Sequence, residues 1–589
     1  MATEPIIGID LGTTNSEVAI IRAGKPCVLD DDGEMILPSV VGLTDDGKLL
    51  VGRAAQNQML LAPQRTIRSV KRRMGEDVKL SLGEQSFSPQ EVSAMILRTL
   101  KVRAEAHLGC PVCKAVITVP AYFNDAQRQA TREAGELAGL EVVRVIHEPT
   151  AASLVYESQQ AAHQKILVYD LGGGTFDVSI VSIENGVVEV LASHGDTHLG
   201  GDDFDALLAD HVAEEFQAAN GVDLREDVRA HAYLLRAVEA AKRRLSVEPY
   251  TRIEEAFLTE RDGVPLHLSV ELDRPTYEDM IRPLIEKTMN SVQTALSDAR
   301  LLASQIDRIV LAGGATRTPL VREMLRERTG CDPHSEVDPD LCVAMGAAVQ
   351  AAMLAGDDVG PVLVDVTPHT FGISCLGELE GFPYPRCFSP IIAKNTALPA
   401  VRTEVYYTHF DNQDRALINV FQGDDPDAMK NTHIGQFAIE GLSEAPCGNP
   451  ILCRLELDLS GMLKVTAREK KTGLEKHIVI DNAMSRFESD EMAAAGDRLK
   501  VLFGDNGTDE SPDEVAAGPE APRTDPLRIK AESIMQRARE ALGEVPSEDR
   551  EEVVNLIERI HDAMNEEEAD TLQSAIEELE EILFYLEEV

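Results

Sequence analysis

Short apolar runs alternate with longer segments of helical periodicity along residues 6–356 of the chain. Near the N-terminus, polar Asp-Asp-Gly turns separate three apolar runs that are expected to form strands, at 17–22, 27–29 and 40–43. The pattern then lengthens into a regular order of helix, strand, helix and strand, at 89–107, 115–119, 123–139 and 140–146. This alternation predicts an α/β fold.

A glycine-rich turn joins two apolar runs in the middle of this region. Residues 166–169 are apolar or aromatic, Asp170 and three glycines follow, and a second apolar run begins at Phe176. Such a turn predicts a β-hairpin. Because glycine has no Cβ, a phosphate can also approach the backbone N–H groups closely, while Thr175 adds a hydroxyl and Asp170 a carboxylate suited to phosphate-bound Mg²⁺. The simpler interpretation is a hairpin without a ligand.

The same pattern occurs at the N-terminus. A strand that begins at Ile6 is followed by Asp10, Gly12 and the hydroxyls of Thr13 and Thr14. Two matching Asp-Leu-Gly turns in one chain favour two related lobes that face one polyphosphate. The alternative is a chance duplication of two glycine turns.

Further candidate residues are distributed over the same region. The segment 68–75 carries four basic residues in an acidic protein, which favours an anion over a solvated basic face. Glu148 stands at the end of a strand, where open α/β sheets bind ligands. In the helix expected at 226–246, four polar residues share one face, either as an ion-pair stripe or as a binding surface: Glu239, Lys242, Arg243 and Ser246.

The pattern of apolar and polar residues changes after residue 366. Strands of alternating apolar and polar residues predominate, with a hairpin around Ser460 and Gly461, so an antiparallel β-sandwich of about 120 residues is expected. A helix is expected at 488–503. The acidic, proline-containing segment 504–526 is expected to be disordered, and three helices are expected at 527–589.

Composition narrows the classes of function. The formal net charge of −45 argues against nucleic acid and against anionic membrane surfaces as partners. The chain enters its first strand at Ile6, which leaves no room for a secretion signal, and nine cysteines suit a reducing compartment, so a cytoplasmic location is expected. Cys110 and Cys113 are expected to serve in packing, although their spacing also occurs in redox sites.

Four motifs in sequence order carry a specific resemblance: Asp10–Ser16, Val116–Asp125, Asp170–Asp177 and Ala312–Arg317. Together they resemble the heat shock protein 70 family of chaperones, of the DnaK type, over residues 6 to about 484 and loosely beyond. The chain looks like a divergent, HscC-like member with an interrupted lid. The resemblance implies an α/β actin-like ATPase domain, built as a duplicated ribonuclease H-like fold, then an antiparallel β-sandwich for peptide, then an α-helical lid.

The resemblance also implies domain boundaries. The nucleotide-binding domain spans 1–356, the linker 357–365 and the substrate-binding sandwich 366–484. The first lid helix spans 485–503, the acidic insert 504–526 and the lid bundle 527–589. In the linker, Gly360 and Pro361 interrupt the usual apolar stretch, which predicts weaker docking on the nucleotide domain. The interrupted lid predicts fast peptide exchange.

The resemblance also assigns roles to residues. Lys71, Glu148, Asp170 and Thr175 would be catalytic, and Asp10, Asp170 and Asp177 would hold metal, with Asp177 on K⁺ and the others on Mg²⁺. Pro120 and Arg128 would relay nucleotide state to the peptide domain. The residues expected to bind ATP or ADP are Gly12, Thr13, Thr14, Gly172, Gly173, Gly174, Gly201, Glu239, Lys242, Arg243, Ser246, Gly313, Gly314 and Arg317.

For the sandwich, the resemblance implies a cleft for extended apolar peptide. Its lining would be Ile373, Leu376, Tyr406, Ala416 and Ile418, although these residues are also natural core positions. The segment 377–390, with its two Pro-aromatic pairs, is expected to be an insertion in the cleft loop. The small Ala416 is expected to admit bulkier side chains.

The implied function is an ATP-dependent molecular chaperone whose cleft opens and closes with ATP binding and hydrolysis. Its expected partners are unfolded client polypeptides, a J-domain co-chaperone and a nucleotide exchange factor. Two alternatives stay open: a peptide-binding regulator that does not cycle, and a small-molecule kinase of the same fold, which would leave the sandwich without a role.

Overall fold

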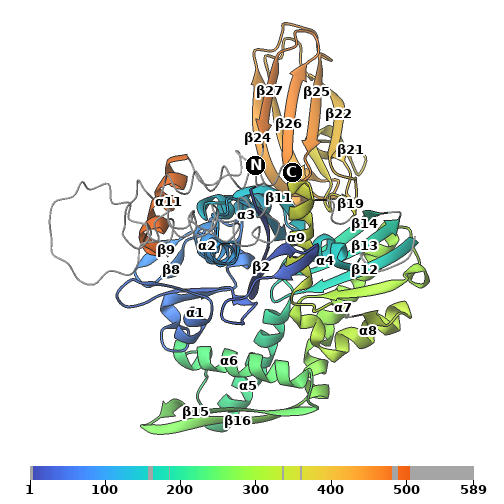
Figure 1. Cartoon of the computed structure of the whole chain (residues 1–589). Coiled ribbons are helices and arrows are strands. Elements are labelled where there is room, and N and C mark those ends of the chain that lie inside the picture. The colour runs from blue at the N-terminus through green and yellow to red at the C-terminus, as the bar shows by residue number, and fades with distance from the viewer. Residues whose placement is uncertain are drawn as a thin grey trace, which may run out of the picture. The chain divides into compact units, whose positions relative to one another are not determined.

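We describe a computed structural model of the chain, which covers residues 4–156, 163–184, 186–334, 337–357, 361–479 and 489–504. The chain divides into two compact units, 1–506 and 507–589. All described residues belong to the first unit (Figure 1). The expected lid bundle, and the acidic insert beyond Gly504, lie outside the described residues.

The first lobe, called lobe I here, is built on a mixed sheet. Its strand order is β11-β10-β1-β2-β3, and β4 also pairs with β2. β1 runs parallel to β10 and antiparallel to β2, so the first glycine turn lies between two neighbouring strands. The strands are β1 (Ile6–Leu11), β2 (Asn15–Arg22), β3 (Lys25–Val28), β4 (Leu37–Pro38), β10 (Lys114–Val119) and β11 (Glu141–His147).

Helices and two small sheets complete lobe I. Ser88 and Glu91 form a capping box at the start of α2, and Asn124 and Gln127 form one at the start of α3, so both helices begin where their sequences provide N-caps. The helices are α1 (Arg53–Gln58), α2 (Pro89–Leu108) and α3 (Asp125–Leu137). A further helix, α4 (Glu148–Tyr156), follows β11 and packs against strands of the second lobe. The small sheets contain β5 (Val40–Leu43), β6 (Leu49–Val51), β7 (Thr66–Arg68), β8 (Leu80–Leu82) and β9 (Gln85–Phe87).

Lobe II repeats this plan on a second sheet, of order β18-β17-β12-β13-β14-β19. β12 pairs antiparallel with β13 across the second glycine turn and parallel with β17. The predicted hairpin is therefore confirmed. The strands are β12 (His163–Leu171), β13 (Phe176–Glu184), β14 (Val187–Asp196), β17 (Arg308–Ala312), β18 (Pro333–His334) and β19 (Val362–Val364).

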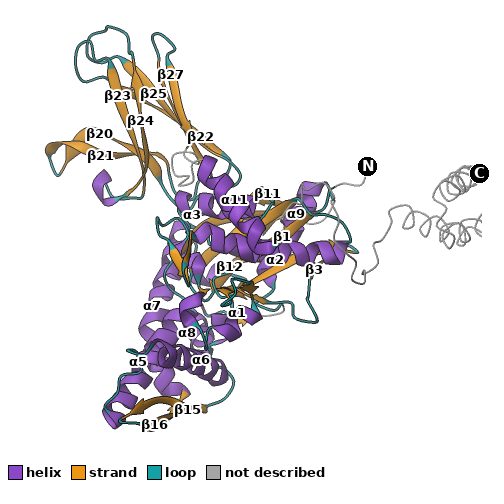
Figure 2. Ribbon diagram, turned by 90° about the vertical axis from the view of Figure 1, so that its left-hand side faces the viewer, coloured by secondary structure: helices purple, strands orange, loops and turns teal. Residues whose placement is uncertain are grey.

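The helices of lobe II pack around a large apolar core. A hairpin of β15 (Tyr250–Arg261) and β16 (Val264–Asp273) lies along α5 and α6 (Figure 2). The helices are α5 (Gly201–Asn220), α6 (Val228–Leu245), α7 (Arg274–Asp298) and α8 (Pro319–Thr329). The next helix, α9 (Cys342–Ala355), packs instead on β1 and β2 of the lobe I sheet. No described helix is long and apolar enough to cross a membrane.

The linker is part of the lobe II sheet. Its strand β19 pairs in parallel with β14, so that Val187 faces Val362 and Glu189 faces Val364. Sequence predicted weaker docking because of Gly360 and Pro361. Three residues suffice for pairing, while Gly360 itself lies outside the described residues.

Two four-stranded antiparallel sheets follow, of order β21-β20-β23-β24 and β22-β25-β26-β27. Their apolar inner faces share one core. The expected antiparallel sandwich and its hairpin around Ser460 are confirmed. The strands are β20 (Phe371–Leu379), β21 (Phe382–Ile392), β22 (Ala400–Tyr407), β23 (Arg415–Gln422), β24 (Thr432–Glu440), β25 (Pro450–Leu457), β26 (Leu463–Glu469) and β27 (Glu475–Val479).

The segment 377–390 was expected to be a loop, which is wrong; that it is an insertion relative to the family stays a prediction. These residues belong to the long hairpin of β20 and β21, which turns at Glu380 and Gly381, both with positive φ. Prolines are tolerated because β21 is an edge strand, whose outer N–H groups need no partner.

The first helix after the sandwich, α11 (Ser489–Phe503), packs on lobe I beside α2 and α3 (Figure 1). Ala495 and Leu499 are buried in the lobe I core. Arg498 donates from Nε to Glu91 Oε1 over 3.0 Å. The resemblance implied a lid over the sandwich, whereas this helix contacts lobe I.

Candidate functional site

The two glycine turns face one cavity of about 570 Å³ between the lobes. Residues from both lobes line the cavity, so side chains far apart in the sequence lie around one space. The predicted site residues in this lining are Asp10, Gly12, Thr13, Thr14, Lys71, Glu148, Asp170, Gly172, Gly173, Thr175, Gly201, Glu239, Lys242, Arg243, Ser246, Gly313, Gly314 and Arg317. Gly174 and Asp177 lie behind this lining.

The glycine turns pack so closely that side chains are excluded at key positions. A Cβ on Gly173 would lie 1.9 Å from Thr14 Oγ1 of the other lobe, and one on Gly200 would lie 2.5 Å from the Gly173 carbonyl carbon. The hydroxyls of Thr13 and Thr14 are buried and have no hydrogen-bond partner in the protein. Two unpartnered donors beside bare backbone fit a phosphate group.

Carboxylates form the other wall of the cavity. Burial raises the pKa of Asp10, an effect that Lys71 and a hydrogen bond from Thr118 Oγ1 at 2.8 Å oppose. Burial, reinforced by neighbouring carboxylates, also raises the pKa of Asp170 well above its ordinary range. Such a concentration of buried acid groups fits a cation that accompanies phosphate.

Lys71 is a cation whose charge acts on these carboxylates. It lies in a turn of 3₁₀ helix, Val70–Arg73, and donates a hydrogen bond to Glu148 Oε1 at the start of α4. Burial raises the pKa of Glu148 to about 7, which Lys71 opposes and Asp10 supports. The pair brings a fixed positive charge and a proton acceptor to one place.

Asp177 is fully buried behind the turn, opposite Asp170 in the strand register. Its Oδ1 accepts a hydrogen bond from the Tyr122 N–H at 3.1 Å. Burial and the charge of Glu148 raise its pKa to about 8. Lobe I repeats the arrangement, because Glu17 lies opposite Asp10.

The other end of the cavity carries the four polar residues of α6. Lys242 Nζ donates to Asp205 over 2.8 Å and to the Gly201 carbonyl over 3.0 Å, and Arg243 pairs with Glu239 at 2.6 Å. The ion pair between Arg243 and Glu239 forms, and all four residues also line the cavity, so the two interpretations of this helix face are compatible. Arg317 Nε donates to Asp340 over 3.1 Å.

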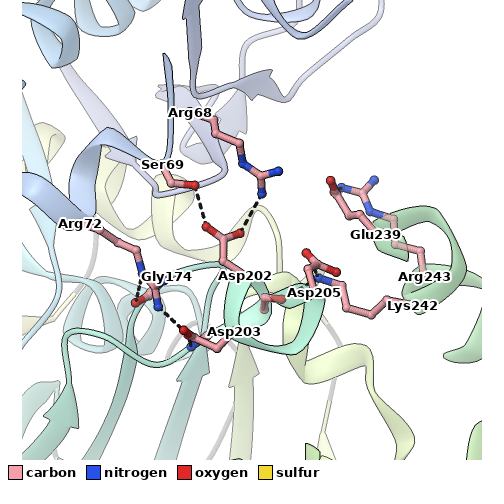
Figure 3. A network of polar contacts seen from close by, with 12 residues as sticks. Arg68, Ser69, Arg72, Gly174, Asp202, Asp203, Asp205, Glu239, Lys242 and Arg243 are labelled. Atoms are coloured by element: carbon pink, nitrogen blue, oxygen red, sulfur yellow. Dashed lines mark hydrogen bonds and ion pairs between the residues drawn. The ribbon is translucent and has the colours of Figure 1, made fainter. Parts of the chain in front are cut away.

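The basic segment 68–75 is not an anion site as a whole, contrary to the sequence-based expectation. Arg68 and Ser69 donate to Asp202, and Arg72 donates to Asp203 and to the Gly174 carbonyl (Figure 3). The carboxylates at the start of α5 satisfy these arginines. Within the segment, Lys71 alone lines the cavity.

The predicted relay residues lie where lobe I meets the linker. Arg128 is buried and donates to the carbonyls of Ala121 and Phe123, on the backbone that follows Pro120. One residue before Glu148, His147 pairs with Asp365 at the end of the linker, 3.0 Å from Nδ1 to Oδ2. Sequence reasoning missed this pair, because 218 residues separate its members.

The predicted peptide-cleft residues divide between core and surface. Ile373 and Ile418 are buried in the sandwich core, with Tyr406 and Ala416 packed against it. Leu376 is 53% exposed. Their role in peptide binding stays a prediction.

Several cavity residues escaped the sequence analysis, among them Glu17, Asp202, Asp205 and Asp340. The position of Glu17, seven residues after Asp10 as Asp177 follows Asp170, was the available signal for one of them. Within the described residues, no group of three or more His, Cys, Asp or Glu side chains is placed to hold a metal ion alone. A cation here would share its ligands with phosphate and water.

Comparison of the chain with known proteins identifies its family. The family model described as "Hsp70 protein" matches residues 6–81 and 76–588. The chain belongs to the Hsp70 family. A Chaperone protein DnaK from Thermotoga neapolitana is 42% identical over 98% of this chain and 96% of its own length. One from Thermosipho africanus is 41% identical over 98% of this chain and 95% of its own length.

The DnaK type is therefore confirmed, and so is the expected function of an ATP-dependent chaperone with ATPase activity. Hsp70 chaperones of this type bind ATP and ADP with Mg²⁺ and act on unfolded clients. The unpartnered hydroxyls, the bare glycine backbone and the acidic wall of the cavity fit these ligands. The closer likeness to HscC-type members stays a prediction.

Proposed function

We propose that ATP hydrolysis between lobes I and II controls the opening of a peptide cleft in the β-sandwich. The observation that carries this proposal is the strand β19, which continues the lobe II sheet and leads directly into the sandwich. A change in the angle between the lobes is thereby passed to the sandwich through main-chain hydrogen bonds. The nucleotide lobes are an actin-like ATPase domain in this account.

In the nucleotide site, the glycine turns and the hydroxyls of Thr13, Thr14 and Thr175 bind phosphate oxygens. Asp10 and Asp170 would hold Mg²⁺, and Asp177 would hold K⁺. The remaining predicted residues enclose the nucleoside from α6 and from the turn after β17. Bound Mg²⁺ supplies charge compensation to the phosphates.

Hydrolysis needs little covalent chemistry from the protein. Water adds to the terminal phosphorus as the bond to the bridging oxygen breaks. Lys71 orients the attacking water and compensates the charge that develops. Glu148 accepts the proton that this water loses, and the proton then passes to the released phosphate. The buried ion pair of Lys71 and Glu148 supports these roles, since it fixes both side chains before the nucleotide arrives.

Communication with the sandwich runs along two routes besides β19. Asp365 joins the linker to His147, beside the catalytic Glu148, and Ser460 of the sandwich accepts a hydrogen bond from the Val145 N–H at 3.3 Å. Pro120 and Arg128 connect the same region to the nucleotide site. The docking of α11 on lobe I supports an arrangement in which the cleft is open.

The cleft binds extended apolar segments of unfolded polypeptides, with Leu376 as its exposed apolar residue and the other four predicted residues as its floor. A J-domain co-chaperone and a nucleotide exchange factor complete the cycle. The regulator that does not cycle is disfavoured, because the linker pairs with lobe II in spite of Pro361.

The test is the release of a fluorescent, extended apolar peptide from the chain with ADP and with ATP. The proposal predicts release at least about tenfold faster with ATP, since opening is coupled to nucleotide. Equal release rates from a chain that binds both ligands would contradict it.

A further inference from the structure

Two cysteines lie opposite each other in the sandwich. Cys375 of β20 and Cys387 of β21 are register partners in an antiparallel pair, and both are free thiols. Directly opposed residues in such a pair have Cα atoms roughly 4.5 to 5.5 Å apart, which lies within the range that a disulfide spans. Among the described strand pairs, this is the one position at which cysteine faces cysteine.

The register places the two cysteine side chains on one face of the sheet, beside a position without a side chain. Opposed residues project their side chains from the same face of a sheet. A Cβ on Gly377, two residues after Cys375 on that face, would lie 3.0 Å from both Cβ and Sγ of Cys387. The lack of a side chain at Gly377 therefore leaves room beside Cys387, which donates only a long hydrogen bond of 3.5 Å to the Tyr384 carbonyl.

The cysteine pair lies at the base of the distal hairpin, residues 376–386, where a disulfide would restrict the motion of that hairpin. The ladder is irregular just beyond it, since Cys375 pairs with Cys387 but Gly377 pairs with Tyr384. The distal hairpin is therefore weakly held at its base. It carries the exposed Leu376.

We propose that Cys375 and Cys387 form a reversible disulfide that stiffens the base of the distal hairpin and slows the exchange of bound peptide. The consequence for peptide rests on the proposed function. Formation of the disulfide does not. In a reducing compartment the thiols stay free, and the bond forms when a peroxide is present.

The chemistry balances with hydrogen peroxide as the oxidant. One cysteine thiolate attacks a peroxide oxygen, giving a sulfenic acid and releasing water after protonation. The second thiol attacks that sulfur, so that the S–S bond forms and a second water leaves. Burial raises the pKa of Cys375, which a hydrogen bond with Ser389 opposes, so the reaction is expected to accelerate as pH rises.

The experiment treats the full chain with hydrogen peroxide and digests it for mass spectrometry without reduction. The proposal predicts a linked pair of peptides that contain Cys375 and Cys387, lighter by two hydrogens and separated by dithiothreitol. A link from Cys375 to Cys453, or oxidation to sulfinic acid without any link, would overturn the assignment. This result depends on no variant and on no peptide ligand.

The second readout is the release of the fluorescent apolar peptide with ADP bound. Oxidation is expected to slow release by about fivefold, an effect mostly on the dissociation rate, and dithiothreitol to restore it. Cys375→Ser and Cys387→Ser should lose this response, whereas Cys447→Ser, which changes an exposed cysteine of the sandwich, should retain it. A linked chain with an unchanged or faster release rate would overturn the regulatory role. A reduced chain that binds no peptide would instead refute the proposed function.

Discussion

Lys71 and Glu148 form an ion pair in which the side chains are only 4% and 9% exposed, at the wall of a cavity that is otherwise rich in carboxylates. Removing one partner would leave a buried charge without compensation, which is costly. His147, the residue before Glu148, contacts Asp365 of the linker, so the pair at the cavity wall and the linker contact are adjacent along the chain.

Glu148→Gln is expected to lower single-turnover hydrolysis by about 100-fold, as for loss of a general base. Because burial raises the pKa of Glu148 to about 7, wild-type hydrolysis should rise as pH increases through that value and the carboxylate ionises. The variant should lack this rise. Rates measured by quenched flow between about pH 6 and pH 8 provide the check, and a flat wild-type profile would contradict the role of Glu148.

Asp203→Asn is expected to accelerate the release of a fluorescent ADP analogue by about tenfold, because a charged hydrogen bond between the lobes is lost. Asparagine keeps an oxygen that accepts from the Gly200 N–H, so the start of α5 should remain capped. The matched control is Asp210→Asn, on the same helix, where the partner Arg225 belongs to lobe II. Equal release from both variants would show that the contact to Arg72 does not hold the lobes together.

Asp365→Asn is expected to leave basal hydrolysis within about twofold of wild type and to abolish stimulation by peptide, since Asp365 lies outside the cavity but joins the linker to His147. Steady-state ATPase assays with and without peptide measure both effects. Asp411→Asn, which weakens a hydrogen bond that Asp411 accepts from the Cys447 N–H within the sandwich, is the control. Full stimulation of the Asp365 variant would exclude this contact from the coupling.

Glu469→Gln is expected to destabilise the sandwich by roughly 2 kcal/mol, because a buried carboxylate that accepts several hydrogen bonds is replaced. Burial alone would raise the pKa of Glu469, but hydrogen bonds from Ser443, Thr472 and Asn449 outweigh it and lower the pKa to about 2. The folded state therefore binds its proton less tightly than the unfolded state.

The stability that the ionised Glu469 contributes is fully present above the ordinary value of 4.5 and is lost as pH falls toward about 2. Denaturant unfolding at several pH values should show wild type and Glu469→Gln converging over this window. Parallel curves would contradict the assignment of the shift to Glu469.

The parts of the fold that sequence predicted are those encoded by neighbouring residues. The turn from Asp170 to Thr175 combines apolar runs, glycines and polar groups within a few positions, so both its hairpin and its chemistry were predictable. Ser88 with Glu91 likewise marks the start of α2 locally.

The errors concern contacts between distant segments and the limits of local rules. Arg68 and Arg72 bind carboxylates more than 130 residues away. The cluster of basic residues alone therefore suggested an anion site, because these partners are not near it in the sequence. Pro383 and Pro385 suggested a loop, but the edge position of β21 tolerates them. Cys110 and Cys113 were assigned to packing, yet both side chains are exposed.

The central claim is that nucleotide hydrolysis and peptide binding are coupled through the linker. The most direct measurement is single-turnover ATP hydrolysis with and without an extended apolar peptide, for wild type and Lys71→Ala. If the two are coupled, peptide accelerates hydrolysis, and Lys71→Ala abolishes hydrolysis in both conditions. Hydrolysis that depends on Lys71 but ignores a peptide shown to bind would contradict the coupling and favour the regulator that does not cycle.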